Sequence, residues 1–133
     1  MMKKYALIVM LTFFVAACTS GKTASFPSLQ FSANVAEVTV IREKRMFGLG
    51  FSMKVLLDDE VIARLKAGEY VKFYTEPGVH SIGVPHSNTS AALERGGKHY
   101  FLIKADASQF GFEIERISER KAESWIAKST PLE

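Results

Sequence analysis

The chain has 133 residues, enough for one small domain with a single hydrophobic core, and a formal net charge of +3. Its 17 basic and 14 acidic residues almost balance, and two of the basic residues, Lys3 and Lys4, lie in a segment that we expect to be removed. This composition excludes the strongly basic surface typical of nucleic-acid binders, and the single cysteine, Cys18, excludes a disulfide within the chain.

Residues 1–17 have the pattern of a bacterial signal peptide. Lys3 and Lys4 precede a largely apolar run from Tyr5 to Ala17, which is 13 residues long. A helix that spans a bilayer needs about 20 apolar residues, so this run is too short to be a permanent membrane span. A basic start, a short apolar run and a small-residue end together predict a cleaved signal.

The run ends in Val15-Ala16-Ala17-Cys18, which resembles the lipobox of bacterial lipoproteins. The resemblance implies a diacylglyceryl thioether on Cys18, cleavage before it and acylation of the new amine; the alternative is a chance cysteine at a conventional cleavage site. Long acyl chains would hold the protein firmly, because each buried CH₂ contributes about 0.8 kcal/mol. Thr19 replaces the aspartate linked to inner-membrane retention, which implies the outer membrane, with the domain facing the periplasm.

Residues 18–34 are expected to be the lipidated cysteine and a tether. Small and polar residues dominate, with Pro27 among them. A flexible chain of this length spans on the order of 20 Å from end to end. We expect the folded domain to occupy 35–133.

Apolar and polar residues then alternate with the period of two that is typical of half-buried strands. Turn signals separate the segments, and the pattern predicts an all-β fold: an antiparallel β-sandwich of about seven strands, with a small barrel as the alternative. The expected strands are Glu37–Val40, Phe51–Leu57, Val61–Leu65, Tyr70–Thr75, Val79–Val84, His99–Ala105 and Gly111–Ile117.

The last segment changes to a helical period. Ala122, Trp125 and Ile126 lie at positions i, i+3 and i+4, and Ser118 is a suitable N-cap. We expect a short C-terminal α-helix over 119–128 that packs Trp125 against the sandwich.

The order of these landmarks resembles the bacterial lipoprotein family catalogued as domain of unknown function 2846. The resemblance covers about 35–117 and implies a β-sandwich on a lipid anchor, with no established activity or catalytic residues. One departure is the hairpin turn, where Asp58-Asp59-Glu60 replaces the family's usual Asp-Gly. The motifs are Val38–Arg42, Met53–Asp58, Val61–Leu65, Gly68–Tyr70, Pro77–His80 and Gly97–Phe101.

Few residues point to catalysis, a metal or a cofactor, and we expect none of the three. His80, His86 and His99 lie at no compact metal-ligand spacing. We expect His80 and His99 to bond to turn carbonyls. The acidic run Asp58-Asp59-Glu60 is interpreted as a solvated turn in preference to a calcium site.

Two segments are candidates for binding a partner. The first is a loop containing Arg45, Met46, Phe47 and Phe51, which mixes basic and large apolar side chains. These side chains form either an interface or a plug that folds back on the core. The second is Pro85–Ser90, expected to be a polar, mobile loop that binds sugar or peptide or only connects strands.

These observations favour a non-enzymatic accessory or interaction module on the cell envelope, with an envelope protein or glycan as its partner. The alternative is a ligand-binding module for glycan, peptidoglycan or a small molecule. A concave face formed by Tyr70, Tyr74 and Tyr100 would favour that alternative. A hydrolase would need a nucleophile and a base that meet in one pocket.

The lipobox yields a direct prediction. Cys18→Ser should abolish lipidation, because the serine hydroxyl cannot carry the thioether. Metabolic labelling with a palmitate analogue tests this, with the wild-type protein as the control. Undiminished label on the variant would contradict the assignment.

Overall fold

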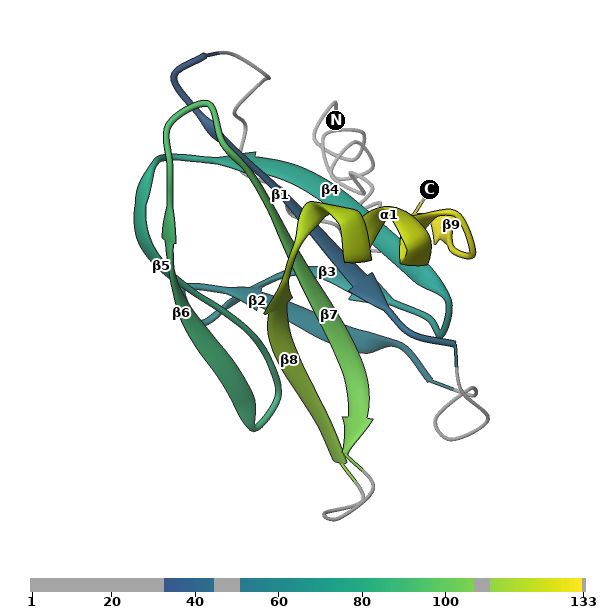
Figure 1. Ribbon diagram of the computed structural model, residues 1–133. Coiled ribbons are helices and arrows are strands. Elements are labelled where there is room, and N and C mark those ends of the chain that lie inside the picture. The colour runs from purple at the N-terminus through teal and green to yellow at the C-terminus, as the bar shows by residue number, and fades with distance from the viewer. Residues whose placement is uncertain (1–32, 45–50, 107–110, 133) are drawn as a thin grey trace, which may run out of the picture.

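The computed structural model describes residues 33–44, 51–106 and 111–132, and these residues form a sandwich of two β-sheets with one helix on its surface (Figure 1). The elements are β1 Ala36–Arg42, β2 Met53–Leu57, β3 Glu60–Leu65, β4 Glu69–Thr75, β5 Gly78–Val84, β6 Ser87–Leu93, β7 Lys98–Asp106, β8 Gly111–Ile117, α1 Glu119–Ile126 and β9 Thr130–Pro131.

The expected all-β sandwich is confirmed, with two differences in detail. One sheet has the order β8-β7-β1-β4-β9 and the other has the order β3-β2-β5-β6. The described residues hold nine strands where about seven were expected, since β6 and β9 were not anticipated. The sheets are also not purely antiparallel, because β1 pairs in parallel with β7 and β4 pairs in parallel with β9.

The prediction of a mobile loop over Pro85–Ser90 is wrong. Pro85 and His86 form a two-residue turn between Val84 and Ser87, and Ser87 begins strand β6, which pairs with β5 along its whole length. The strand was not predicted because β6 begins with serine, asparagine and threonine. This part of the edge strand buries no large apolar side chain, so the alternating pattern is absent there.

Strand β1 is buried along its whole length, since both of its faces are covered. Val38 and Val40 point between the sheets into the main core, and Ile41 points to the opposite face. On that outer face α1 packs over the sheet near β1 and β7 (Figure 1), and Ala122 is fully buried there.

The helix begins as expected and ends two residues early, at Ile126 in place of Lys128. Ser118 is the N-cap, and its hydroxyl accepts a hydrogen bond from the Lys121 amide at 3.3 Å. Trp125 is partly buried against the outer-face cluster, outside the space between the sheets. Trp125 therefore fixes a surface helix to the sheet.

A polar contact ties the β2–β3 turn to β5. Asp58 and Asp59 have φ values of 49° and 68°, which fits the type I′ turn favoured in two-residue hairpins. The Asp58 carboxylate accepts from the Ser81 amide at 2.9 Å and contacts His80 Nδ1 at 2.6 Å. His80 Nε2 lies 2.7 Å from the Glu76 carbonyl oxygen, so the expected bond from His80 to a turn carbonyl is confirmed.

His99 differs from the expectation of a bond to a turn carbonyl. Its Nε2 accepts a hydrogen bond from the backbone amide of Glu94 at 3.0 Å, and the Arg116 guanidinium faces Nδ1. Burial and the charge of Arg116 lower the pKa of His99. The Nε2 atom therefore acts as an acceptor for the turn before β7.

The packing of α1 predicts the effect of removing its tryptophan. Trp125→Ala should lower the free energy of unfolding by about 2 kcal/mol, because a partly buried aromatic side chain loses its apolar contacts. Arg120→Ala, on the exposed face of the same helix, should change it by less than about 0.5 kcal/mol. Urea unfolding measures both, and equal effects would contradict the packing role.

The Asp58–His80 contact predicts a pH dependence. Burial lowers the pKa of His80, but hydrogen bonds to Asp58 and to the Glu76 carbonyl outweigh it, so the pKa is raised. Burial raises the pKa of Asp58, and the bonds from His80 and the Ser81 amide reverse this, so that pKa is lowered. The stability that His80 contributes is fully present below about pH 6.5 and is lost as pH rises through the folded pKa.

The stability that Asp58 contributes depends on pH in the opposite direction. It is fully present above about pH 3.9 and is lost as pH falls through the folded pKa. The difference in urea midpoint between the wild type and a His80→Gln variant should therefore be largest near about pH 5 and smaller near about pH 8. A midpoint difference that is the same at both pH values would show that the ion pair adds no stability.

Candidate functional site

A pocket of about 590 Å³ lies at one end of the sandwich. This is the lower end in Figure 1, where β7 ends and β8 begins. The lining residues come from the start of β2, the turn before β6 and the two strands joined by the β7–β8 connection: Phe51, Ser52, Met53, Lys54, Pro85, His86, Asp106, Gly111 and Phe112.

A buried arginine supports the aromatic part of this pocket. Arg42, the last residue of β1, is only 1% exposed, and its Nη1 donates to the carbonyl oxygens of Phe51 at 2.8 Å and Leu65 at 2.7 Å. Its guanidinium carbon lies 5.0 Å from the ring centroid of Phe51 and 5.2 Å from that of Phe112. Burial lowers the pKa of Arg42, although the charge of Glu69 opposes that shift.

The two phenylalanine rings also contact each other, edge to face, with centroids 5.7 Å apart and an interplanar angle of 80°. This geometry is favourable for aromatic pairs. Phe51 is nevertheless 48% exposed. The pocket therefore presents a large apolar side chain whose backbone and ring are both held from beneath by Arg42.

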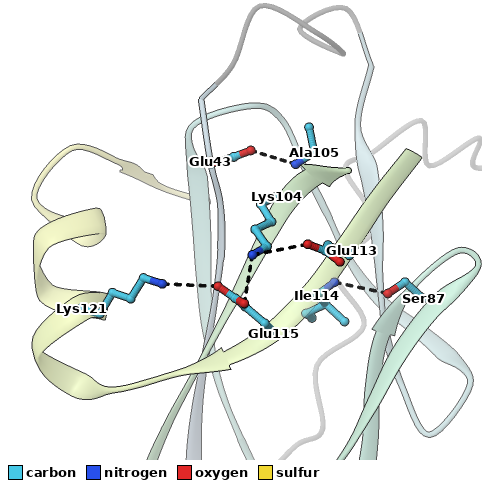
Figure 2. A network of polar contacts seen from close by, with 8 residues as sticks. All are labelled: Glu43, Ser87, Lys104, Ala105, Glu113, Ile114, Glu115 and Lys121. Atoms are coloured by element: carbon cyan, nitrogen blue, oxygen red, sulfur yellow. Dashed lines mark hydrogen bonds and ion pairs between the residues drawn. The ribbon is translucent and has the colours of Figure 1, made fainter. Parts of the chain in front are cut away.

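Two hydrogen bonds between a backbone amide and a side chain link the neighbouring strands, as Figure 2 shows. The buried Glu43 accepts a hydrogen bond from the amide of Ala105 at 2.8 Å, next to the pocket residue Asp106. Ser87 Oγ accepts from the amide of Ile114 at 3.3 Å and so links the turn before β6 to β8. The polar side chains of the pocket therefore stand on strand ends that are joined to one another.

The other contacts in Figure 2 lie on the outer face of the five-stranded sheet. Lys104 Nζ lies 3.4 Å from Glu113 and 3.1 Å from Glu115, and Lys121 of α1 reaches Glu115 at 3.4 Å. The bond from Lys104 lowers the pKa of Glu115. These side chains are about one-third to one-half exposed, so we interpret them as surface ion pairs of small energetic value that connect β7, β8 and α1.

His86 occupies an uncommon backbone conformation at the pocket. Its φ is 67°, in the left-handed region that favours glycine, and it follows Pro85 in the two-residue turn. An L-residue in this region costs about 1 kcal/mol or more. The fold alone would favour glycine at this position, so the imidazole is present at the pocket at a conformational cost.

The structure places only part of the sequence-predicted site. Phe51 lies in the pocket, whereas Arg45, Met46, Phe47 and the lipidation candidate Cys18 fall outside the described residues. Pro85 and His86, from the second candidate segment, also line the pocket. Sequence reasoning missed the other six lining residues, which only folding brings together: Ser52, Met53, Lys54, Asp106, Gly111 and Phe112.

Tyr70, Tyr74 and Tyr100 do share one face, the outer face of the five-stranded sheet, where they lie opposite alternate residues of β1. Tyr100 is buried there, however, and its hydroxyl donates to Glu119 of α1 at 3.3 Å. Burial is also the main reason that the pKa of Tyr100 is raised. The helix thus covers part of this tyrosine face, which lies apart from the pocket.

Within 33–44, 51–106 and 111–132, no three His, Cys, Asp or Glu side chains gather closely enough to hold a metal ion. The same ranges contain no helix with the length and hydropathy needed to cross a bilayer. No protein-family model matches the chain, and neither a curated protein nor a solved structure matches it significantly. The resemblance to the domain of unknown function 2846 family therefore stays a prediction.

Proposed function

We propose that this protein is a lipid-anchored, non-enzymatic binding module of the cell envelope, held in the outer membrane through Cys18. We assign partner binding to the pocket at the Phe51 end of the sandwich. The observation that carries the proposal is the half-exposed Phe51 ring, fixed by the fully buried Arg42. Aromatic side chains held rigidly at a surface commonly anchor a binding interface, because little side-chain entropy is lost on binding.

The direction of β1 supports this arrangement. Near the start of β1 the Val35 carbonyl accepts from the Gly96 amide, and the strand ends at Arg42 beneath the pocket. Seven residues in a strand span roughly 23 Å. The chain thus enters the sandwich at one end and the pocket opens at the other, so a lipid tether before Val35 would join the domain at the end away from the pocket.

The roles of the histidines favour binding over catalysis. His80 is engaged on both ring nitrogens by Asp58 and by the Glu76 carbonyl, and His99 has Glu94 and Arg116 against its ring. Both contacts stabilise turns. Of the three histidines, only His86 lines the pocket.

Site-specific photocrosslinking in intact cells tests the proposal. A benzophenone amino acid in place of Ser52, at the pocket, should give discrete crosslinked products. The same probe in place of Val79, which is 74% exposed and at the opposite end of β5 from the pocket, should not. Adding Phe51→Ala should reduce the products about tenfold, the effect of losing about 1.4 kcal/mol of binding free energy.

Val61→Ala, which shortens an exposed apolar side chain on β3, is the matched control and should leave the crosslinked products unchanged. Identical products from positions 52 and 79, or products insensitive to Phe51→Ala, would rule out the pocket as the binding site.

A further inference from the structure

The pocket lining combines two aromatic residues, Phe51 and Phe112, which we call the floor, with four polar residues, which we call the rim: Ser52, Lys54, His86 and Asp106. Arg42 packs against the Phe51 ring, and Phe51 remains 48% exposed where it lines the pocket. Phe112 meets Phe51 edge to face and holds its orientation. The pocket therefore presents a half-exposed aromatic ring to a ligand, and contacts with Arg42 and Phe112 hold that ring.

The rim offers both hydrogen-bond donors and acceptors. Lys54 provides only donors, Asp106 in its ionised form provides only acceptors, and Ser52 and His86 can do either. The charges of Lys54 and Asp106 have opposite signs, so the rim favours no strongly charged ligand. It suits a neutral ligand with many groups that both donate and accept.

We infer that the ligand is a glycan, with one sugar ring stacked on Phe51 and its hydroxyls bonded to the rim. This inference rests on the proposed function and specifies its partner. A pyranose ring has an apolar face of C–H groups and a periphery of hydroxyls, each of which donates and accepts. The pocket has the same division between its floor and its rim.

Other ligand classes fit less well. An acyl chain would desolvate Lys54 and His86 and offer them no hydrogen-bonding group. A phosphate-rich ligand would need several cations, and Lys54 is the single lysine or arginine among the described lining residues. An extended peptide adds to a strand edge, whereas the lining comes from strand ends and turns. The volume of about 590 Å³ lies in the range of small-molecule sites.

The test uses the full lipidated protein in nanodiscs, with chitotetraose and maltotetraose as soluble probes and saturation-transfer NMR as the readout. At least one tetrasaccharide should bind saturably, with magnetisation transferred to its ring C–H protons. Phe51→Ala should weaken binding at least about tenfold. Val79→Ala, an apolar truncation outside the pocket, should leave it unchanged.

His86→Gly keeps the test decisive if Phe51→Ala disturbs the fold. Glycine is favoured at the φ of 67°, so this variant should unfold at the same or a higher urea concentration and still bind sugar several-fold more weakly. Absence of saturable binding by both tetrasaccharides, or binding that neither variant weakens, would overturn the inference.

The failures of the two proposals are distinguishable. If position 52 crosslinks to a protein in cells but neither sugar binds, the binding module stands and the glycan assignment fails. If position 52 gives no specific product and no sugar binds, both proposals fail.

Discussion

The structure depends most on the burial of a charged side chain at the end of its central strand. Arg42 is 1% exposed, and burying a guanidinium is costly unless it is hydrogen-bonded. The carbonyls of Phe51 and Leu65 both accept from its Nη1, and the rings of Phe51 and Phe112 lie against its planar group. One side chain from the five-stranded sheet thus holds the chain before β2 and the end of β3 in the other sheet.

The rigidity of that position follows from how β1 is enclosed. The four-stranded sheet covers one face of β1, α1 packs near its other face, and β4 and β7 bond to its two edges. A strand enclosed on all four sides has little room to shift. The aromatic floor of the pocket therefore rests on the strand that is buried along its whole length, which accords with a preformed binding site.

The period of two in the sequence was enough to predict the sandwich, because most strands bury one face. It failed for β6, whose first four residues are Ser87, Asn88, Thr89 and Ser90, and for β9, which has only two residues. The parallel pairing of β1 with β7 could not be predicted either, since local patterns carry no information about which distant strands become neighbours.

The site was predictable to a smaller extent. Phe51 was found because its segment mixes basic and large apolar side chains, a pattern that is typical of interfaces. Lys54, Asp106 and Phe112 are ordinary residues in their local sequence, and only the fold brings them together. Arg42 appeared only as the last residue of a motif in the family resemblance, because its burial beside two aromatic rings is a property of the tertiary structure.

The central claim, that Arg42 holds the pocket end together, is tested most directly by urea unfolding of Arg42→Met beside Arg64→Met. Methionine keeps much of the apolar length of arginine but leaves the carbonyls of Phe51 and Leu65 without their donor. An unsatisfied buried carbonyl, such as that of Leu65, costs about 1 to 3 kcal/mol, and the part-buried carbonyl of Phe51 adds about 1 kcal/mol. Arg42→Met should therefore lower the free energy of unfolding by roughly 2 to 4 kcal/mol. Arg64, exposed on β3, should tolerate the change within about 0.5 kcal/mol. Equal, small effects of the two substitutions would contradict the account.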